Sequence, residues 1–165
     1  MKNLSDLNLE SIKLVAFDFD GVFTNNRVTV DENGKESVIC SREDGLGLRK
    51  LDKLDIYKCI ISSETNKLVK KRAKKLGIDC FHAVENKAYI LQNLTTQKNI
   101  DLKNVLFLGN DINDIPAFTI VGFPVGVFDS NKEINQSVIC FTEKKGGQGA
   151  VREVCDKIYS SQSNE

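Results

Sequence analysis

Two aspartates separated by one residue, Asp18 and Asp20, end a short apolar run and are followed by Gly21. The apolar run is typical of a buried β-strand, and the carboxyl end of a parallel strand is where α/β folds bind ligands. Two partly desolvated carboxylates about 5 Å apart repel each other by several kcal/mol unless a cation compensates. Gly21 allows a sharp turn and a close approach to a ligand. The pattern indicates a cation-assisted site, although acidic residues at strand ends are also common turn formers.

A second acidic segment, GNDIND over 109–114, follows another strand-like run. If the two strands are neighbours in one sheet, Asp111 and Asp114 come within reach of the same ion as the first pair of aspartates. Oxygen ligands without His or Cys select Mg²⁺ over transition metals. The alternative for Asp114 is that it caps the helix that follows, and both interpretations can hold together.

Two further segments carry groups that suit a phosphate. Ser62 and Ser63 follow the run YKCII where a helix is expected to begin, and hydroxyls with free N–H groups at a helix start form an anion site. Lys87 lies just before another helical pattern, and its ammonium is a compact charge suited to phosphate. Taken singly, Ser62 is as readily an ordinary N-cap, and Lys87 a solvated surface residue.

Short apolar runs that alternate with helix-length segments must position these groups. The predicted strands cover 13–19, 57–61, 79–82, 105–108, 123–127 and 138–141. The predicted helices cover 45–54, 65–76, 87–98, 114–121 and 149–160. Strands that are apolar on both faces indicate a parallel sheet covered on both sides. The predicted fold class is therefore α/β, with a doubly wound parallel sheet.

One segment departs from this alternation. Residues 27–30 and 36–40 alternate polar and apolar side chains and flank DENGK, which predicts a β-hairpin with its turn at Asn33-Gly34. No internal repeat, low-complexity stretch or linker is evident. The polar tail over 160–165 is expected to be disordered.

Composition excludes several classes of protein. The 165 residues carry 23 Lys and Arg against 23 Asp and Glu, a balance that argues against a dedicated nucleic-acid binder. No apolar run approaches the roughly 18 residues of a membrane span, and the N-terminus lacks the apolar stretch of a signal peptide. The five cysteines form no CxxC pair, and a single His makes a zinc site improbable. We expect a cytoplasmic protein with reduced thiols and neither a membrane nor a nucleic-acid partner.

The order of these segments resembles the four motifs of the haloacid dehalogenase superfamily of aspartate-nucleophile phosphatases. The resemblance runs from about residue 13 to residue 153 and is strongest to the small, capless sugar-acid phosphatases. The motifs that carry it are DFDGVFTN (18–25), REDG (42–45), GNDINDIPAF (109–118) and GGQGAVREV (146–154). It implies one Rossmann-like domain over residues 1–165, with a hairpin flap over about 27–40 and no large cap domain.

The resemblance implies a role for each reacting group. Asp18 matches the nucleophile that forms an aspartyl-phosphate, and Asp20 matches the general acid/base. Mg²⁺ would be held by the Asp18 carboxylate, the Asp20 backbone carbonyl and an aspartate of the GNDIND segment. Ser62 would hydrogen-bond the phosphoryl oxygens, and Lys87 would pair with them and with Asp18.

This chain departs from the usual pattern of the family at two points. Where many relatives have Gly-Asp-Asp, it has Gly-Asn110-Asp111, so Asp111 is the expected metal ligand, with Asp114 and Asn110 in support. In many relatives a glycine follows the hydroxyl residue of the second family motif, which is Ser62 here; this chain has Ser63 instead of that glycine. Together with Gly21, Ser63 is expected to lie close to the substrate.

The resemblance also suggests the substrate. At the position after Ser63, the octulosonate branch of the family usually has Arg, whereas this chain has Glu64. A Glu at this position resembles the branch that acts on nine-carbon nonulosonate 9-phosphates. A carboxylate there could accept hydrogen bonds from a longer polyol or amide tail. Arg72, Lys75 and Arg152 are candidates for the substrate carboxylate, although Arg72 and Lys75 also fit a solvated basic helix face. A 3-deoxy-manno-octulosonate 8-phosphate remains the alternative substrate.

In the capless phosphatases the hairpin helps to build a tetramer whose subunits share active sites, so a homotetramer is expected. Two other classes of protein compete with a phosphatase. One is a non-catalytic oligomerisation module of the kind found with acylneuraminate cytidylyltransferases, which has no need of paired buried acids. The other is a phospho-accepting receiver domain, which lacks both the DxD pair and the hairpin.

Overall fold

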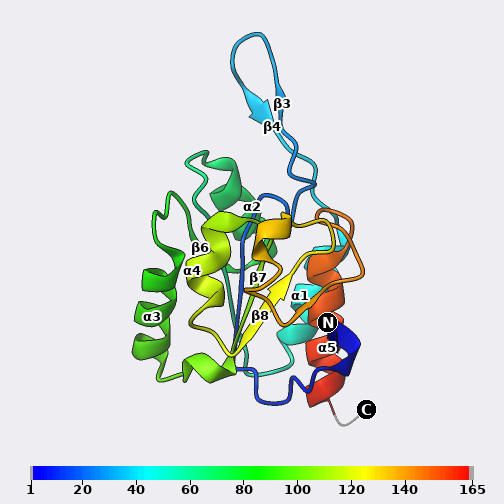
Figure 1. The fold of residues 1–165 in the computed structure, drawn as a ribbon. Helices are drawn as coiled ribbons and strands as arrows, with labels where there is room; N and C mark the ends of the chain where they lie inside the picture. The colour runs from blue at the N-terminus through cyan, green and yellow to red at the C-terminus, as the bar shows by residue number, and fades with distance from the viewer. Residues whose placement is uncertain (1, 164–165) are drawn as a thin grey trace.

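A seven-stranded parallel sheet forms the centre of the computed structural model, which describes residues 2–163 (Figure 1). The strand order is β1-β9-β8-β7-β2-β5-β6. The strands are β1 (Lys2–Asn3), β2 (Leu14–Phe17), β5 (Tyr57–Ile61), β6 (Asp79–Phe81), β7 (Val105–Gly109), β8 (Phe123–Gly126) and β9 (Cys140–Phe141). All pairings are parallel, so the carboxyl ends meet at one edge. The predicted doubly wound α/β fold is confirmed; β1, which pairs with β9, was not predicted.

Helices cover both faces of the sheet. They are α1 (Glu43–Leu51), α2 (Leu68–Leu76), α3 (Lys87–Lys98), α4 (Ile115–Phe118) and α5 (Ala150–Gln162), with 3₁₀ turns η1 (Leu4–Asp6), η2 (Leu102–Asn104), η3 (Ile112–Asp114) and η4 (Lys132–Ile134). Side chains of α1, α2 and α5 share one buried cluster, and those of α3 and α4 share the other. Figure 1 shows α3 and α4 on one flank of the sheet and α1 and α5 on the other.

Strand β2 shows why the sheet needs two covered faces. Val15 and Phe17 belong to the cluster with α1, α2 and α5, whereas Leu14 and Ala16 belong to the cluster with α3 and α4. All four are fully buried. Because successive strand residues point to opposite faces, a strand covered on both sides is continuously apolar.

Strands β2 and β7 are neighbours in register, and this places the two acidic segments together. Phe17 pairs with Leu108, and the next residue, Asp18, donates its backbone N–H to the Leu108 carbonyl at 2.9 Å. Strands β2 and β7 therefore end at the same level of the sheet, and the two acidic segments begin side by side. The predicted adjacency of the two acidic segments is confirmed.

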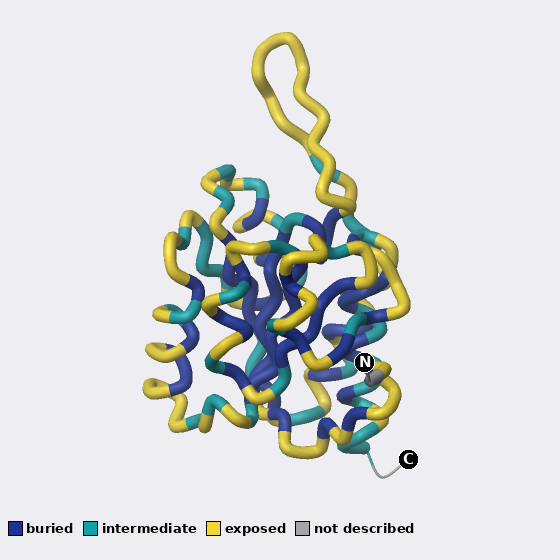
Figure 2. The backbone as a smooth tube through the Cα atoms, viewed as in Figure 1, coloured by how far each residue is buried: buried dark blue, intermediate teal, exposed yellow. Residues whose placement is uncertain are grey.

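The hairpin consists of β3 (Thr29–Val30) and β4 (Glu36–Ser37) and projects beyond the body of the molecule (Figure 1). Its residues are almost all exposed, as Figure 2 shows. The turn is wider than predicted: Asp31 accepts from the Gly34 N–H at 2.9 Å and donates to the Lys35 carbonyl at 3.0 Å. Gly34 adopts φ +76°, a conformation that favours glycine.

The expected disorder of the tail over 160–165 is wrong for its first residues, because α5 continues to Gln162. The Gln162 side-chain amide donates to the carbonyls of Leu9 and Ile12 at 3.0 and 2.9 Å, which anchors the end of the helix to the N-terminal segment. Residues 164–165 of the predicted tail lie outside the described residues. Over residues 2–163, no helix has the length and apolarity to cross a membrane.

Candidate active site

An open cleft of about 410 Å³ lies at the carboxyl edge of the sheet. Its walls include five residues from three strand ends that were predicted to act together: Asp18, Asp20, Ser62, Asn110 and Asp111. Parallel pairing of β2 with both β5 and β7 brings these loops side by side. The cleft is therefore built where an α/β sheet is expected to bind ligands.

Lys87 joins the acidic groups below the cleft. Its Nζ lies 2.8 Å from Asp18 Oδ2 and 2.6 Å from Asp114 Oδ1, and the side chain is only 1% exposed. Asn86 caps helix α3 by accepting the Tyr89 N–H, so Lys87 begins the helix at a fixed position. Lys87 is thus a buried ion-pair partner, and the alternative of a solvated surface lysine is wrong.

Asp114 is the anchor of the second acidic loop. It is fully buried, and its Oδ2 accepts the backbone N–H groups of Asn110 and Asp111 at 2.8 and 3.2 Å. With Lys87 on Oδ1, both of its carboxylate oxygens are occupied within the protein. Asp114 therefore holds the backbone of the loop from which Asp111 lines the cleft. That Asp111 binds the metal ion with Asp114 in support stays a prediction.

The electrostatic balance at Asp18 depends on its neighbours. Burial and the nearby Asp114 raise the pKa of Asp18 to about 7, against the opposing effects of Lys87 and of the Phe19 N–H, which donates to Oδ1 at 2.7 Å. Burial raises the pKa of Asp20 as well, and Glu64 adds to that shift. Two carboxyls with raised pKa values in one cleft are typical of a catalytic or ion-binding site.

The oxygen atoms around Asn110 suit a hard cation. Asn110 Oδ1 is buried without a hydrogen-bond partner among residues 2–163. A Cβ on Gly21 would lie 2.1 Å from Asn110 Nδ2, so only glycine lets the two loops approach this closely. In the described part of the chain, no three His, Cys, Asp or Glu side chains are placed to hold a metal ion by themselves, so amide and backbone oxygens would have to complete a ligand set here. Such a donor set fits Mg²⁺.

The loop after β5 provides the hydroxyl side of the cleft. Ser62 is 2% exposed, and its Oγ accepts the Glu64 N–H at 3.1 Å. Ser63 Oγ accepts from Asn113 Nδ2 at 3.0 Å, which links this loop to the acidic loop after β7. Hydroxyl and carboxyl groups thus line one open space, with the Lys87 ammonium buried behind Asp18, an arrangement that suits a phosphoryl group bound with a metal ion.

Comparison with known proteins agrees with this chemistry. Residues 47–154 match the sequence profile of the haloacid dehalogenase-like hydrolases. The chain belongs to this family. Two of the motifs noted in the sequence, DFDGVFTN and GNDINDIPAF, contribute Asp18, Asp20, Asn110 and Asp111 to the cleft of this haloacid dehalogenase-like hydrolase.

Named relatives of this haloacid dehalogenase-like hydrolase are sugar-acid phosphatases. The 3-deoxy-D-manno-octulosonate 8-phosphate phosphatase KdsC of Escherichia coli K12 is 34% identical over 154 residues, which cover 93% of this chain and 82% of that one. The same enzyme from Moraxella catarrhalis, solved with magnesium, phosphate and KDO, has a TM-score of 0.91 at 32% identity, over 98% of this chain and 92% of that one. The predicted phosphatase activity is confirmed.

Three residues expected to contact the substrate do not line the cleft of this hydrolase. Arg72 and Lys75 border a separate hollow of about 520 Å³, together with Arg42 and Arg49. Arg152 lies on α5, where its Nε donates to Asp156 at 2.8 Å. All three residues lie on the predicted helices, but none of them lines the cleft of its own chain.

Some residues of the hydrolase cleft were missed in the sequence. Asn26 and Asn113 line it, and Asn26 adopts the left-handed region with φ +61°. Thr24 donates a hydrogen bond to Asp20 at 3.3 Å. Thr24 and Asn113 lie within the motifs DFDGVFTN and GNDINDIPAF, so these motifs were the available signal, whereas Asn26 lies one position beyond the first of them. A side-chain contact, however, has no signature in residue order.

Glu64 links the cleft to a second hollow. This hollow of about 250 Å³ lies between the hairpin stem and the start of α2, and it shares Asp20, Asn26 and Glu64 with the cleft. Glu64 Oε1 accepts the Asn66 N–H at 2.7 Å, so part of its role is to hold the turn before α2. Asn66 in turn donates to Glu36 of the hairpin at 2.9 Å. The hollow is therefore continuous with the cleft at Asp20.

Proposed function

We propose that this phosphatase hydrolyses a sugar-acid phosphate, with 3-deoxy-octulosonate 8-phosphate as the favoured substrate. The observation that carries the proposal is the buried Lys87 between Asp18 and Asp114, directly below a cleft lined by acidic and hydroxyl groups. Relatives that cover nearly the whole chain carry the name of that activity.

In the first half of the reaction, an Asp18 carboxylate oxygen attacks phosphorus, and the bond between phosphorus and the sugar oxygen breaks. Asp20 gives its carboxyl proton to the departing sugar oxygen and becomes a carboxylate. Ser62 donates a hydrogen bond to a phosphoryl oxygen, and Lys87 offsets negative charge beside Asp18. The products of this half are the free sugar acid and an aspartyl-phosphate on Asp18.

In the second half, the Asp20 carboxylate takes a proton from a water molecule whose oxygen bonds to phosphorus. The bond between phosphorus and the Asp18 oxygen breaks, which restores the Asp18 carboxylate and releases phosphate. Burial and Glu64 raise the pKa of Asp20, so that its carboxyl holds a proton more readily than an exposed aspartate does. Asp20 thereby ends the cycle protonated again.

Mg²⁺ is the proposed cofactor. Asp18, Asp111 and the Asp20 carbonyl would hold it, with the unpartnered Asn110 Oδ1 beside them. When bound, the ion supplies charge neutralisation for the phosphoryl group. The Moraxella catarrhalis relative was solved with magnesium and phosphate, which supports this assignment.

A nonulosonate 9-phosphate is the second candidate substrate, and Glu64 is the observation that favours it. Glu64 borders both the cleft and the adjoining hollow, so its carboxylate is available to hydroxyl or amide donors of a longer tail. The names of the relatives favour the eight-carbon acid instead.

We further propose a homotetramer with shared active sites. The projecting hairpin exposes Val28, Val30 and Ile39, which are 52%, 57% and 77% exposed. Exposed apolar side chains on one flap are typical of a protein interface. In such an assembly Arg72 and Lys75 would be free to serve a neighbouring subunit, since they lie away from the cleft of their own chain. A monomer in sizing chromatography with light scattering would contradict this part of the proposal.

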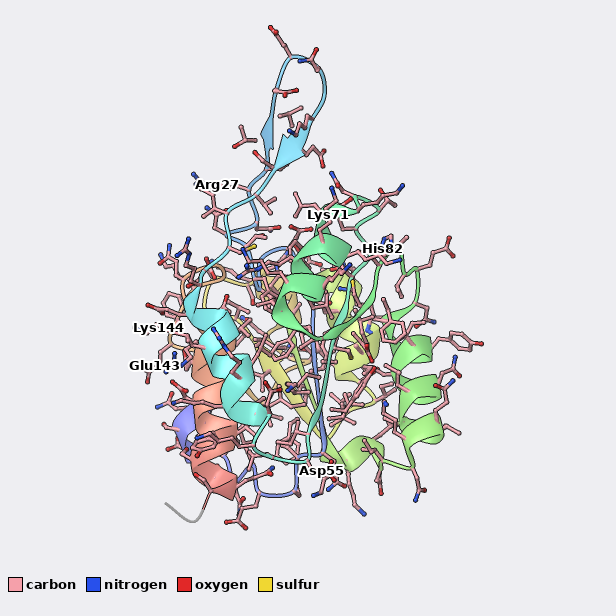
Figure 3. All side chains as sticks on the ribbon, turned by 180° about the vertical axis from the view of Figure 1, so that it is seen from behind. Arg27, Asp55, Lys71, His82, Glu143 and Lys144 are labelled. Atoms are coloured by element: carbon pink, nitrogen blue, oxygen red, sulfur yellow. The ribbon has the colours of Figure 1, made fainter. Side chains whose placement is uncertain are left out.

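The test of function is phosphate release from a panel of octulosonate and nonulosonate phosphates, with Mg²⁺ and with EDTA. We expect turnover that EDTA abolishes, and loss of turnover in Asp18→Asn with an unchanged circular dichroism spectrum. Asp55→Asn is the matched control, because Asp55 is exposed at the opposite end of the molecule from the hairpin (Figure 3). Turnover by Asp18→Asn comparable to that of the wild type would refute the nucleophile assignment.

A further inference from the structure

The Thr24 hydroxyl lies between the backbone of the catalytic turn and the carboxyl of Asp20. Thr24 is fully buried, and its Oγ1 donates to Asp20 Oδ1 at 3.3 Å. Among residues 2–163, this is the one hydrogen bond made to the Asp20 carboxyl. Asp20 borders both the cleft and the adjoining hollow, so its orientation decides which of its oxygens faces a bound substrate.

The other contacts of Thr24 determine where its hydroxyl hydrogen points. Oγ1 accepts the backbone N–H of Gly21 at 3.2 Å and that of Asn26 at 3.1 Å. A hydroxyl has two acceptor lone pairs and one hydrogen to donate. Because two backbone donors occupy the lone pairs, the hydrogen is directed at Asp20 Oδ1. Oδ1 is then an acceptor, and a proton on the Asp20 carboxyl must reside on Oδ2.

The turn that carries Asp20 is also held by contacts that do not involve this hydroxyl. The Phe19 carbonyl accepts the N–H groups of Val22, Phe23 and Thr24 at 3.2, 2.9 and 3.3 Å. From outside, Gly147 donates its N–H to the Val22 carbonyl at 3.0 Å. The side chains of Val22 and Phe23 are fully buried. The hydroxyl is therefore not the sole support of the turn.

The glycine-rich segment before α5 reinforces the same turn. A Cβ on Gly146 would lie 2.0 Å from the Gly21 carbonyl oxygen, and a Cβ on Gly147 would lie 2.7 Å from the Asn25 nitrogen. The two backbones therefore touch, which only glycine permits here. The motif GGQG is explained by this contact rather than by a contact with substrate.

We propose that Thr24 is a positioning residue, which holds Asp20 Oδ1 so that Oδ2 presents its proton to the oxygen of the leaving group. The proposal rests on the proposed phosphatase mechanism, in which Asp20 acts as the general acid. Thr24 itself is buried and lines neither the cleft nor the adjoining hollow, so it acts only through Asp20. Its effect should therefore depend on how strongly the leaving group needs a proton.

Leaving-group chemistry separates positioning from a merely structural role. An alkoxide leaving from a sugar phosphate needs the proton, whereas p-nitrophenolate leaves readily without it. For phosphoryl transfer, kcat/KM reports the step in which Asp20 acts as the acid. A general acid contributes roughly 10²–10⁴-fold to such a step. Loss of correct positioning should therefore lower kcat/KM for the sugar phosphate much more than for p-nitrophenyl phosphate.

The experiment compares Thr24→Val, Thr24→Ala and Thr24→Ser with the wild type, using an octulosonate or nonulosonate phosphate and p-nitrophenyl phosphate with Mg²⁺. Thr24→Val keeps the shape of the side chain without the hydroxyl, and Thr24→Ala leaves space for water at the two N–H groups. We expect either variant to lose about 10²-fold in kcat/KM for the sugar phosphate and less than about threefold for p-nitrophenyl phosphate. Thr24→Ser should retain both activities within about threefold.

Equal losses for the two substrates, or a Thr24→Ser variant as impaired as Thr24→Val, would overturn the positioning role. Asp20→Asn is the reference for a missing acid, and adding Thr24→Val to it should cause little further loss for the sugar phosphate. If Asp20→Asn itself shows no selective loss, the acid assignment fails. If the wild type hydrolyses no sugar-acid phosphate, the proposed substrate class fails. These two outcomes are distinct from a failure at Thr24 alone.

Discussion

Lys87 Nζ lies 2.8 Å from Asp18 Oδ2 with both side chains buried, and the same nitrogen lies 2.6 Å from Asp114 Oδ1. Burial lowers the pKa of Lys87, but the two carboxylates together raise it above its usual value, so the ammonium stays charged. One positive charge thus faces two negative ones from different loops. The excess negative charge leaves the cleft suited to a divalent cation.

Replacement of Lys87 by methionine should impair both activity and folding. Without the ammonium, Asp18 and Asp114 would be buried without a counter-charge, and breaking a buried ion pair costs about 3–5 kcal/mol. Urea unfolding should show a loss of that order, and kcat/KM should fall by about 10²–10³-fold. Lys103→Met is the control, because its pair with Asp101 is exposed and worth no more than about 1 kcal/mol. Similar stability changes in the two variants would contradict this prediction.

Asp111 and Asp114 should separate into a ligand and a support. Asp111→Asn is expected to raise the Mg²⁺ concentration needed for half-maximal activity by at least about 10–100-fold, with little change in unfolding. Asp114→Asn should destabilise the protein by about 3 kcal/mol, because an amide nitrogen would face Lys87 or the backbone donors that now share the carboxylate. Magnesium titrations and urea unfolding of both variants measure the two effects. If Asp111→Asn and Asp114→Asn changed the Mg²⁺ requirement and the unfolding free energy alike, the assignment of Asp111 as ligand and Asp114 as support would be wrong.

Asp44 should make stability fall as the pH rises. Burial raises the pKa of Asp44 to about 7, although its Oδ1 accepts the Arg152 N–H, and its Oδ2 has no partner among residues 2–163. The folded state therefore holds a proton that the unfolded chain releases near pH 4, so this contribution is complete below pH 4 and is lost between about pH 4 and 7.

In Asp44→Asn the uncharged amide removes this dependence. The unfolding free energy of the variant minus that of the wild type should therefore rise by up to about 4 kcal/mol from pH 4 to pH 8. Urea unfolding at both pH values measures the difference directly. A difference between the two proteins that does not change with pH would show that Asp44 ionises normally in the folded state.

Glu64 should influence the choice between eight-carbon and nine-carbon substrates. Glu64→Arg would place a cation beside the hollow next to Asp20, which disfavours donor-rich tails and favours a sugar carboxylate. We expect the ratio of kcat/KM for the octulosonate to that for the nonulosonate phosphate to rise by about tenfold or more. Glu143→Arg is the matched control, because Glu143 is exposed and remote from the hairpin (Figure 3). An unchanged ratio in Glu64→Arg would exclude this role.

Most of the sheet could be predicted because its buried strands are continuous apolar runs. Strand β1 could not, because two residues carry no pattern, and Lys2–Asn3 becomes a strand only by pairing with Cys140–Phe141. The helical end at Gln162 likewise depends on carbonyls from the N-terminal segment, 153 and 150 positions away in the chain. Contacts of this kind leave no local signal.

Residue types and their order determined the chemistry of the site: two acids after one strand, a hydroxyl after the next, a lysine at a helix start and a second acidic loop. Tertiary structure alone decided which of these atoms meet. It buried Lys87 between two aspartates, turned Arg72 and Lys75 toward another hollow, and aimed the Thr24 hydroxyl at Asp20. The physical reason is that side-chain identity is a local property. Burial and hydrogen-bond geometry, in contrast, arise only when segments distant in the chain pack together.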